Sequence, residues 1–301
     1  MRSKLFFVLL VFLYTLSINC AQARKPLLAF IGPQGAVRTF SNGQTRSFGL
    51  RDGAKLVSDN TLHSYDETAS CFLTQKASTL SADILPGDRL MAYVDDDGDF
   101  YVYFQGQTKK LTSYAPKEYR VSGKMLAYVD DDGDFFVYHD GATKKLNSYA
   151  PQSFKLGGGM LAYVDDDGDF FIYDGTTAKK LDPYAPKSYE VGNGIVAYVD
   201  HDGDFFVFYE GQAKKLNSWE PKEYKVGAGL LAYVDDDGDF FVFDRGNLKK
   251  LTSYAPQQFK VGGQMVAYVD DDGDFFVYEK GKVTKLGSYP PQDFIIGEPV
   301  F

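Results

Sequence analysis

Clusters of aspartate recur along the sequence and are the first candidates for chemistry. The stretch Ala-Tyr-Val-Asp-Asp-Asp-Gly-Asp-Phe occurs in six copies, the first at Ala92, at a spacing of 35 residues, and His201 replaces the middle aspartate of one copy. Carboxylate oxygens are ligands that Ca2+ prefers. We therefore consider the alternate aspartates of each copy as candidate calcium ligands. These are Asp95, Asp97, Asp99, Asp130, Asp132, Asp134, Asp165, Asp167, Asp169, Asp200, Asp202, Asp204, Asp235, Asp237, Asp239, Asp270, Asp272 and Asp274.

The same stretches also have a simpler interpretation as tight turns. Asp-Gly is a favoured turn pair, and aspartate side chains accept hydrogen bonds from the amides of a turn. The spacing of Asp95, Asp97 and Asp99 is that of the start of an EF-hand loop, but the glycine is fourth rather than sixth and no glutamate follows at position twelve. The sequence therefore favours turns. Calcium binding is the alternative, because a cation would relieve the repulsion among 23 clustered aspartates.

An aromatic residue also recurs once in each repeat, in the segment that joins one repeat to the next. These rings could pack one repeat against another, or they could face a groove and stack on a sugar or another ligand. We consider them candidate ligand-binding residues. They are Tyr114, Tyr149, Tyr184, Trp219, Tyr254 and Tyr289.

The elements that must position these residues are short strands. In the unit 151–185, strand propensity and Gly or Asp-Gly punctuation predict strands over 153–156, 160–164, 170–173 and 179–181. The sequence shows no helical pattern. Four short antiparallel strands at a fixed period predict an all-β fold, and the period suits the blade of a β-propeller better than a solenoid coil. Lysine pairs such as Lys179-Lys180 would lie on the outermost strand, where we expect them to deter edge association rather than to bind an anion.

The two ends of the chain predict that the ring is closed. The segment 291–297 matches 256–262, so the chain begins one more unit and stops after its first strand, whereas the N-terminal segment starts at Leu27 with the second strand of a unit. Together the two ends would make one blade. With six regular repeats over about 84–290 and two degenerate repeats over about 27–83, we expect eight four-stranded blades, seven being the alternative.

The repeat also has a recognisable sequence pattern. Gly-Gly-Gly-Met-Leu-Ala-Tyr-Val-Asp starts at Gly157, and Asp-Gly, an aromatic strand, a second Asp-Gly and Lys-Lys-Leu follow it. This pattern resembles the WD40-like propeller repeat of the TolB type, over more than 200 residues, although no Trp-Asp pair ends the strands and the units are shorter. The resemblance implies a propeller fold with a role in binding or assembly, and it implies no catalytic residue.

Residues 1–23 have the features of a secretory signal peptide. Arg2 and Lys4 precede an apolar run of about 14 residues, and Ala21-Gln22-Ala23 fits a cleavage site. That run is shorter than the roughly 20 residues of a membrane span, and acylation of Cys20 is a further alternative. We expect a single secreted or periplasmic domain over 24–301, monomeric and without a membrane span.

Charge and cysteine content restrict the function further. Cleavage would change the formal net charge from −9 to −11, which disfavours nucleic acid, because phosphate binding needs clustered cations. Cys71 would then be the only cysteine, so no intramolecular disulfide is possible, and we expect a small buried apolar side chain.

The sequence does not predict an enzyme. It contains no Gly-x-Ser-x-Gly elbow, His-Glu-x-x-His pair or phosphate-binding glycine loop, and His63, His139 and His201 occupy different repeat positions. We expect a non-catalytic binding or scaffold propeller, with a protein or glycan partner at the acidic hairpins. The alternative is a calcium-dependent, multivalent carbohydrate-binding propeller. A third hypothesis is a hydrolase with its active site at the propeller axis.

Overall fold

A computed structural model describes residues 90–104 and 107–296 and the backbone of five strands nearer the N-terminus. Every regular element in these segments is a β-strand. None of the described residues belongs to a helix that is long and apolar enough to cross a membrane. The first eight strands are β1 (Leu28–Ile31), β2 (Val37–Ser41), β3 (Gln44–Phe48), β4 (Thr61–Asp66), β5 (Cys71–Lys76), β6 (Met91–Val94), β7 (Phe100–Phe104) and β8 (Gln107–Thr112).

The regular repeats supply the remaining strands, four to each repeat, and a last strand follows near the C-terminus. These strands are β9 (Glu118–Ser122), β10 (Met125–Val129), β11 (Phe135–His139), β12 (Ala142–Asn147), β13 (Ser153–Gly157), β14 (Met160–Val164), β15 (Phe170–Tyr173), β16 (Ala178–Asp182), β17 (Ser188–Gly192), β18 (Ile195–Val199), β19 (Phe205–Tyr209), β20 (Gln212–Asn217), β21 (Glu223–Val226), β22 (Leu230–Val234), β23 (Phe240–Asp244), β24 (Asn247–Thr252), β25 (Gln258–Gly262), β26 (Met265–Val269), β27 (Phe275–Glu279), β28 (Lys282–Gly287) and β29 (Phe294–Ile296).

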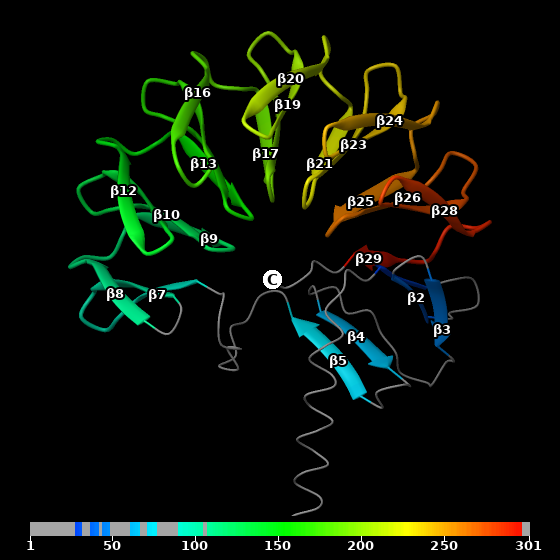
Figure 1. The fold of residues 1–301 in the computed structure, drawn as a ribbon, viewed down its shortest axis with the longest axis horizontal. Coiled ribbons are helices and arrows are strands. Elements are labelled where there is room, and N and C mark those ends of the chain that lie inside the picture. The colour runs from blue at the N-terminus through cyan, green and yellow to red at the C-terminus, as the bar shows by residue number, and fades with distance from the viewer. Residues whose placement is uncertain are drawn as a thin grey trace, which may run out of the picture.

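The described strands form antiparallel sheets that stand around a common centre (Figure 1). Six sheets have four strands each, β6 to β8 form a three-stranded sheet, and β4 pairs with β5. In the sheets of the regular repeats the first strand, such as β13, lies nearest the centre and the fourth, such as β16, lies outermost. This arrangement confirms the prediction of an all-β fold built from four-stranded antiparallel units.

The terminal strands β1 and β29 belong to the same sheet, in the order β29-β1-β2-β3. They pair antiparallel, with Leu28 opposite Ile296 and Phe30 opposite Phe294. This is the pairing that the matching ends of the sequence predict. The predicted signal peptide, its cleavage site and Cys20 lie outside the described residues, and of Cys71 only the backbone is described.

The core lies between neighbouring sheets, because the second strand of each regular sheet is apolar on both faces. All five residues of β14 are buried. Leu161 and Tyr163 pack against Phe135 in the preceding sheet, whereas Met160 and Ala162 pack against the following one. Burial of a large apolar side chain contributes about 2 kcal/mol, so each sheet is held by both of its neighbours.

A tyrosine and a phenylalanine meet at each boundary between regular sheets. The rings of Phe135 and Tyr163 lie 5.4 Å apart in an edge-on arrangement, and the equivalent rings of Phe240 and Tyr268 are 5.3 Å apart. Burial, with a smaller contribution from the charge of Asp165, raises the pKa of Tyr163 to about 12. The folded structure therefore stabilises the neutral phenol of Tyr163 relative to the phenolate.

The innermost strands approach one another so closely that Gly157 and Gly192 leave no room for a Cβ atom. A Cβ atom at Gly192 of β17 would overlap the carbonyl oxygen of Gly227, and one at Gly157 of β13 would overlap the carbonyl of Val191. Neither glycine has a positive φ, so space rather than backbone conformation selects the residue.

Candidate functional site

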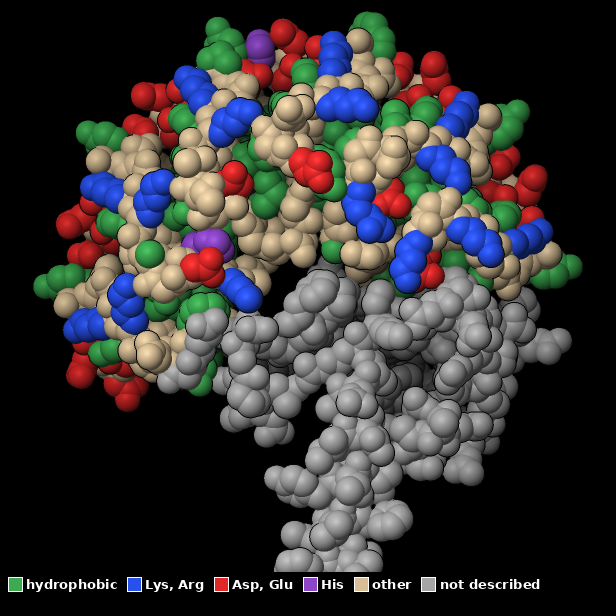
Figure 2. All heavy atoms as spheres, viewed as in Figure 1, with side chains coloured by type: hydrophobic (Ala, Val, Ile, Leu, Met, Phe, Trp, Pro, Cys, Tyr) green, Lys and Arg blue, Asp and Glu red, His purple; other side chains and the backbone are tan. Residues whose placement is uncertain are grey.

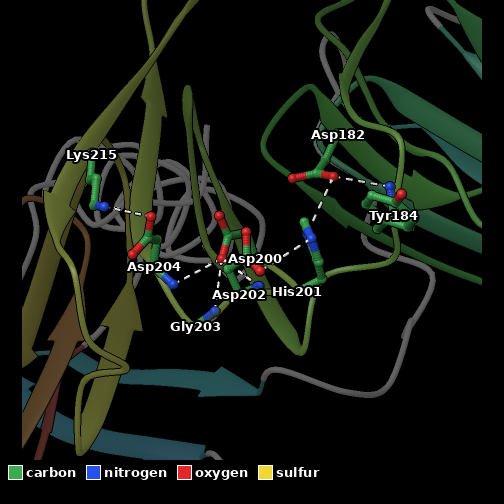
Figure 3. Close-up of polar contacts among 8 residues, drawn as sticks. All are labelled: Asp182, Tyr184, Asp200, His201, Asp202, Gly203, Asp204 and Lys215. Atoms are coloured by element: carbon green, nitrogen blue, oxygen red, sulfur yellow. Dashed lines mark hydrogen bonds and ion pairs between the residues drawn. The ribbon is translucent and has the colours of Figure 1, made fainter.

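Each aspartate copy forms a hairpin turn, between the second and third strands of the four-stranded sheets and between β6 and β7 of the three-stranded sheet. Asp200 illustrates the geometry: its carboxylate Oδ1 accepts hydrogen bonds from the amides of Asp202, Gly203 and Asp204 at 3.0, 2.9 and 2.8 Å (Figure 3). The glycine adopts a φ of 99°, which a residue with a Cβ rarely does. In every regular hairpin the first aspartate accepts a bond from the amide of the fifth residue at 2.8–2.9 Å. These first aspartates are Asp95, Asp130, Asp165, Asp200, Asp235 and Asp270.

The fifth residue of each hairpin also has a partner within its own sheet. The carboxylate of Asp204 lies 2.5 Å from the Nζ of Lys215, on the outermost strand β20. The bond with Asp99 raises the pKa of Lys110. Aspartate and lysine thus tie together the two outermost strands of every regular sheet. The pairs are Asp99–Lys110, Asp134–Lys145, Asp169–Lys180, Asp204–Lys215, Asp239–Lys250 and Asp274–Lys285.

These contacts bear on the predicted calcium ligands, which are the first, third and fifth residues of each hairpin. The first is bonded to turn amides and the fifth to a lysine, as Asp200 and Asp204 show. Within the described segments, no group of three or more His, Cys, Asp or Glu side chains is placed to hold a metal ion. The hairpins as described do not fit a calcium site, and calcium binding stays a prediction of the sequence.

The second and third residues of the hairpins face solvent. Asp166 and Asp167 are both exposed, and the same holds at the equivalent positions of the other hairpins. Eleven of these twelve residues are aspartates, so each hairpin carries negative charge that the turn itself does not use. The residues are Asp96, Asp97, Asp131, Asp132, Asp166, Asp167, His201, Asp202, Asp236, Asp237, Asp271 and Asp272.

The linker aromatics are also exposed. The exposed fraction of the six residues ranges from 56% for Tyr184 to 70% for Tyr289. The linker backbone is held by local bonds: the hydroxyl of Thr112 donates to the carbonyl of Tyr114 at 2.7 Å, and the amide of Tyr184 donates to Asp182 at 3.0 Å. The rings are therefore not buried between repeats, although the ring of Tyr184 contacts His201 of the next repeat.

Hairpins and linkers lie side by side. Asn147, at the end of β12, donates to the carboxylate of Asp166 in the next hairpin at 2.6 Å, and the side-chain amide of Gln152 donates to the carbonyl of Asp166 at 3.2 Å. We call the exposed hairpin residues together with the linker rings the acidic–aromatic rim. Figure 2 shows acidic and hydrophobic side chains following one another along the outer edge of the described sheets.

At one boundary of the rim, the two residues in contact differ from those at the equivalent boundaries. Asn147 meets Asp166 and Asn217 meets Asp236, in each case with the asparagine donating at 2.6–2.7 Å. At the equivalent boundary Asp182 stands in place of the asparagine and His201 in place of the aspartate, with Nδ1 of the histidine 3.8 Å from the carboxylate (Figure 3). The ring of Tyr184 lies 4.3 Å from the imidazole. His201 therefore avoids the facing of two carboxylates.

The first lysine of four pairs has a role that the sequence did not indicate. Nζ of Lys179 donates to the carbonyl of Gly211, in the next sheet, at 2.9 Å and lies 5.7 Å from the ring centre of Phe208. Lys109, Lys144 and Lys249 make the same kind of contact. Because the partner lies 32 residues further along the chain, only the arrangement of the sheets reveals these connections.

A cavity of about 490 Å³ lies between the innermost strands β9, β13 and β17. It is lined by Arg120, Val121, Lys155, Leu156, Glu190 and Val191. Lys155 pairs with Glu190 at 2.9 Å, and Arg120 pairs with Glu118 at 2.9 Å. The charges at this cavity therefore compensate one another, and the amine of Lys155 is paired with a carboxylate.

The chain is similar to one family model in sequence and to several solved structures in fold. A family model described as a 10-bladed beta propeller domain matches residues 11–179 and 155–301. No curated protein matches the sequence. Among solved structures, yeast RCC1 (Prp20) bound to Kap60 is similar at 9% identity over 64% of this chain and 68% of that chain, with a TM-score of 0.39. Human WBSCR16 is similar at 10% identity over 92% and 99%, with a TM-score of 0.40.

Proposed function

The chain belongs to the 10-bladed β-propeller domain family, and from that premise we propose that it is a non-catalytic binding module that uses the acidic–aromatic rim. The observation that carries this proposal is the exposure of one large aromatic ring at every described linker, 56–70% of each residue. Tyrosine and tryptophan side chains are enriched at interfaces, because each combines a large apolar ring with a polar group. The partner would be a protein or a glycan.

We extend the proposal to the form of the ring and to its compartment. Pairing of β1 with β29 supports a closed ring, and the eight sheets of the described strands support eight blades rather than the ten of the family's description. The repeat pattern from Gly157 supports the TolB type, and the features of residues 1–23 support secretion or a periplasmic location.

The proposal is tested by screening the purified chain against a glycan array and a set of defined peptides, with calcium and with a chelator. The variant carries Tyr149→Ala, Trp219→Ala and Tyr254→Ala together. Leu248→Ala is the matched control, because this residue is 41% exposed but lies on β24, away from the rim. We expect wild type and control to bind and the triple variant to lose binding.

Two outcomes would overturn the proposal. One is a ligand that the triple variant binds as well as wild type does, and the other is the absence of any ligand. Loss of glycan binding on chelation would favour the calcium-dependent alternative.

A further inference from the structure

In one sheet the lysines are engaged away from the exposed carboxylates of the hairpin. In the sheet of β13 to β16, Lys180 is paired with Asp169, and Lys179 donates to the carbonyl of Gly211. The exposed carboxylates of Asp166 and Asp167 receive neither lysine. The uncompensated charge beside Tyr149 is therefore negative. The hairpins of Gly133, Gly203 and Gly238 instead have a lysine close by, Lys117, Lys187 and Lys222 respectively.

We propose that the acidic–aromatic rim binds a polypeptide segment rich in lysine and arginine. The inference rests on the proposed function and names the chemistry of the partner. A cation over the face of an exposed tyrosine or tryptophan gains cation–π attraction, and a carboxylate beside the ring adds an ion pair. A neutral glycan would use the rings but not the charge.

The rim sites differ in charge in a way that ranks them. Beside Tyr149, the residue that approaches the hairpin is Gln152, which donates to the carbonyl of Asp166 at 3.2 Å. Gln257 makes the same bond to Asp271 near Tyr254 at 3.1 Å. Both hairpins keep two exposed aspartates with no lysine at that position.

The site beside Tyr184 is the least acidic. There His201 replaces one exposed aspartate and Lys187 replaces the glutamine. Nζ of Lys187 comes within 3.1 Å of the place that a Cβ on Gly203 would occupy, which puts this cation against the hairpin. The sites of Tyr149 and Tyr254 should therefore bind a cationic segment more strongly than the site of Tyr184 does. Repetition of the sites around the rim adds avidity for a long partner.

The test measures binding of poly-L-lysine to the full chain by fluorescence anisotropy over a series of salt concentrations, with dextran as a neutral probe. We expect binding that weakens as salt rises. Tyr149→Ala and Tyr254→Ala should each weaken it about two- to fivefold, the worth of one exposed cation–π contact. Tyr184→Ala is the matched control within the rim and should have a smaller effect.

A second pair of variants addresses the charge. Asp167→Asn should weaken binding and reduce its dependence on salt, whereas Asp140→Asn should not, because this exposed carboxylate lies at the β11–β12 turn, outside the rim. Equal binding by all tyrosine variants would overturn the inference, leaving only non-specific attraction between a polycation and an acidic protein. Rim-dependent binding of dextran or another glycan, without binding of poly-L-lysine, would overturn it while leaving the proposed function intact.

Discussion

At the scale of single residues, near-identical repeats show which contacts tolerate exchange. The boundary contact of Asn147 with Asp166 recurs as Asn217 with Asp236, and as Asp182 with His201 between them. In each pair an aspartate accepts, and the other residue, an asparagine or a histidine, has a side-chain nitrogen facing it. The sequence alone shows the substitution of His201 but not its reason, because the compensating residue lies 19 positions earlier in a different sheet.

This exchange predicts a double-variant effect. His201→Asp alone would set a carboxylate against Asp182, and we expect a loss of about 0.5 kcal/mol of stability, because the pair is partly exposed. Addition of Asp182→Asn would recreate the arrangement of Asn147 and Asp166 and should restore that stability. Denaturant unfolding of both variants measures the effect. A double variant no more stable than His201→Asp would refute the explanation.

At the scale of strands, the sequence predicts most of what the structure shows. Strands expected over 153–156, 160–164, 170–173 and 179–181 occur as β13 to β16, with ends that differ by one residue at most. The reason is that aromatic and β-branched runs and Asp-Gly turns act locally. The close approach of the innermost strands at Gly192 depends on the neighbouring sheet, so the local sequence pattern does not predict it.

Gly192 gives the prediction at this scale. Gly192→Ala would push a methyl group into the carbonyl of Gly227, and we expect a loss of about 1–3 kcal/mol, the usual cost of overpacking. Gly287→Ala is the control, because the nearest atom to its Cβ would be 3.6 Å away and equivalent positions carry Thr112 and Asn147. Denaturant unfolding compares the two. Equal losses would show that backbone freedom, rather than space, accounts for the effect at Gly192.

At the scale of the whole molecule, neighbouring sheets are joined by the same contacts at successive boundaries. Lysine Nζ atoms reach the next sheet on the outermost strand, as in Lys179, and on the innermost strand, where Lys225 donates to the carbonyl of Phe259 at 2.8 Å. The sequence predicts the aspartate turns and the rim that carries the aromatics. It could not predict the partners of the lysines, because those partners lie 32 to 34 residues away along the chain.

The buried tyrosines predict how stability changes at alkaline pH. Burial and a nearby aspartate raise the pKa of Tyr128, Tyr163 and Tyr268 to about 12. Since these pKa values are raised in the folded state, their contribution is complete below the unfolded value of about 10 and is lost as pH rises through about 12. The free energy of unfolding should therefore decrease as the pH rises from about 10 to about 12. Tyr163→Phe should reduce the slope, and an unchanged slope would contradict the assignment.

The pairing of β1 with β29 has a mechanical consequence. Leu28 at the start of β1 lies opposite Ile296 at the end of β29, so tension applied at these two positions would peel the strands apart one hydrogen bond at a time instead of shearing all of them at once. Under load the molecule would part first at this seam, while the hairpins of the other sheets still held.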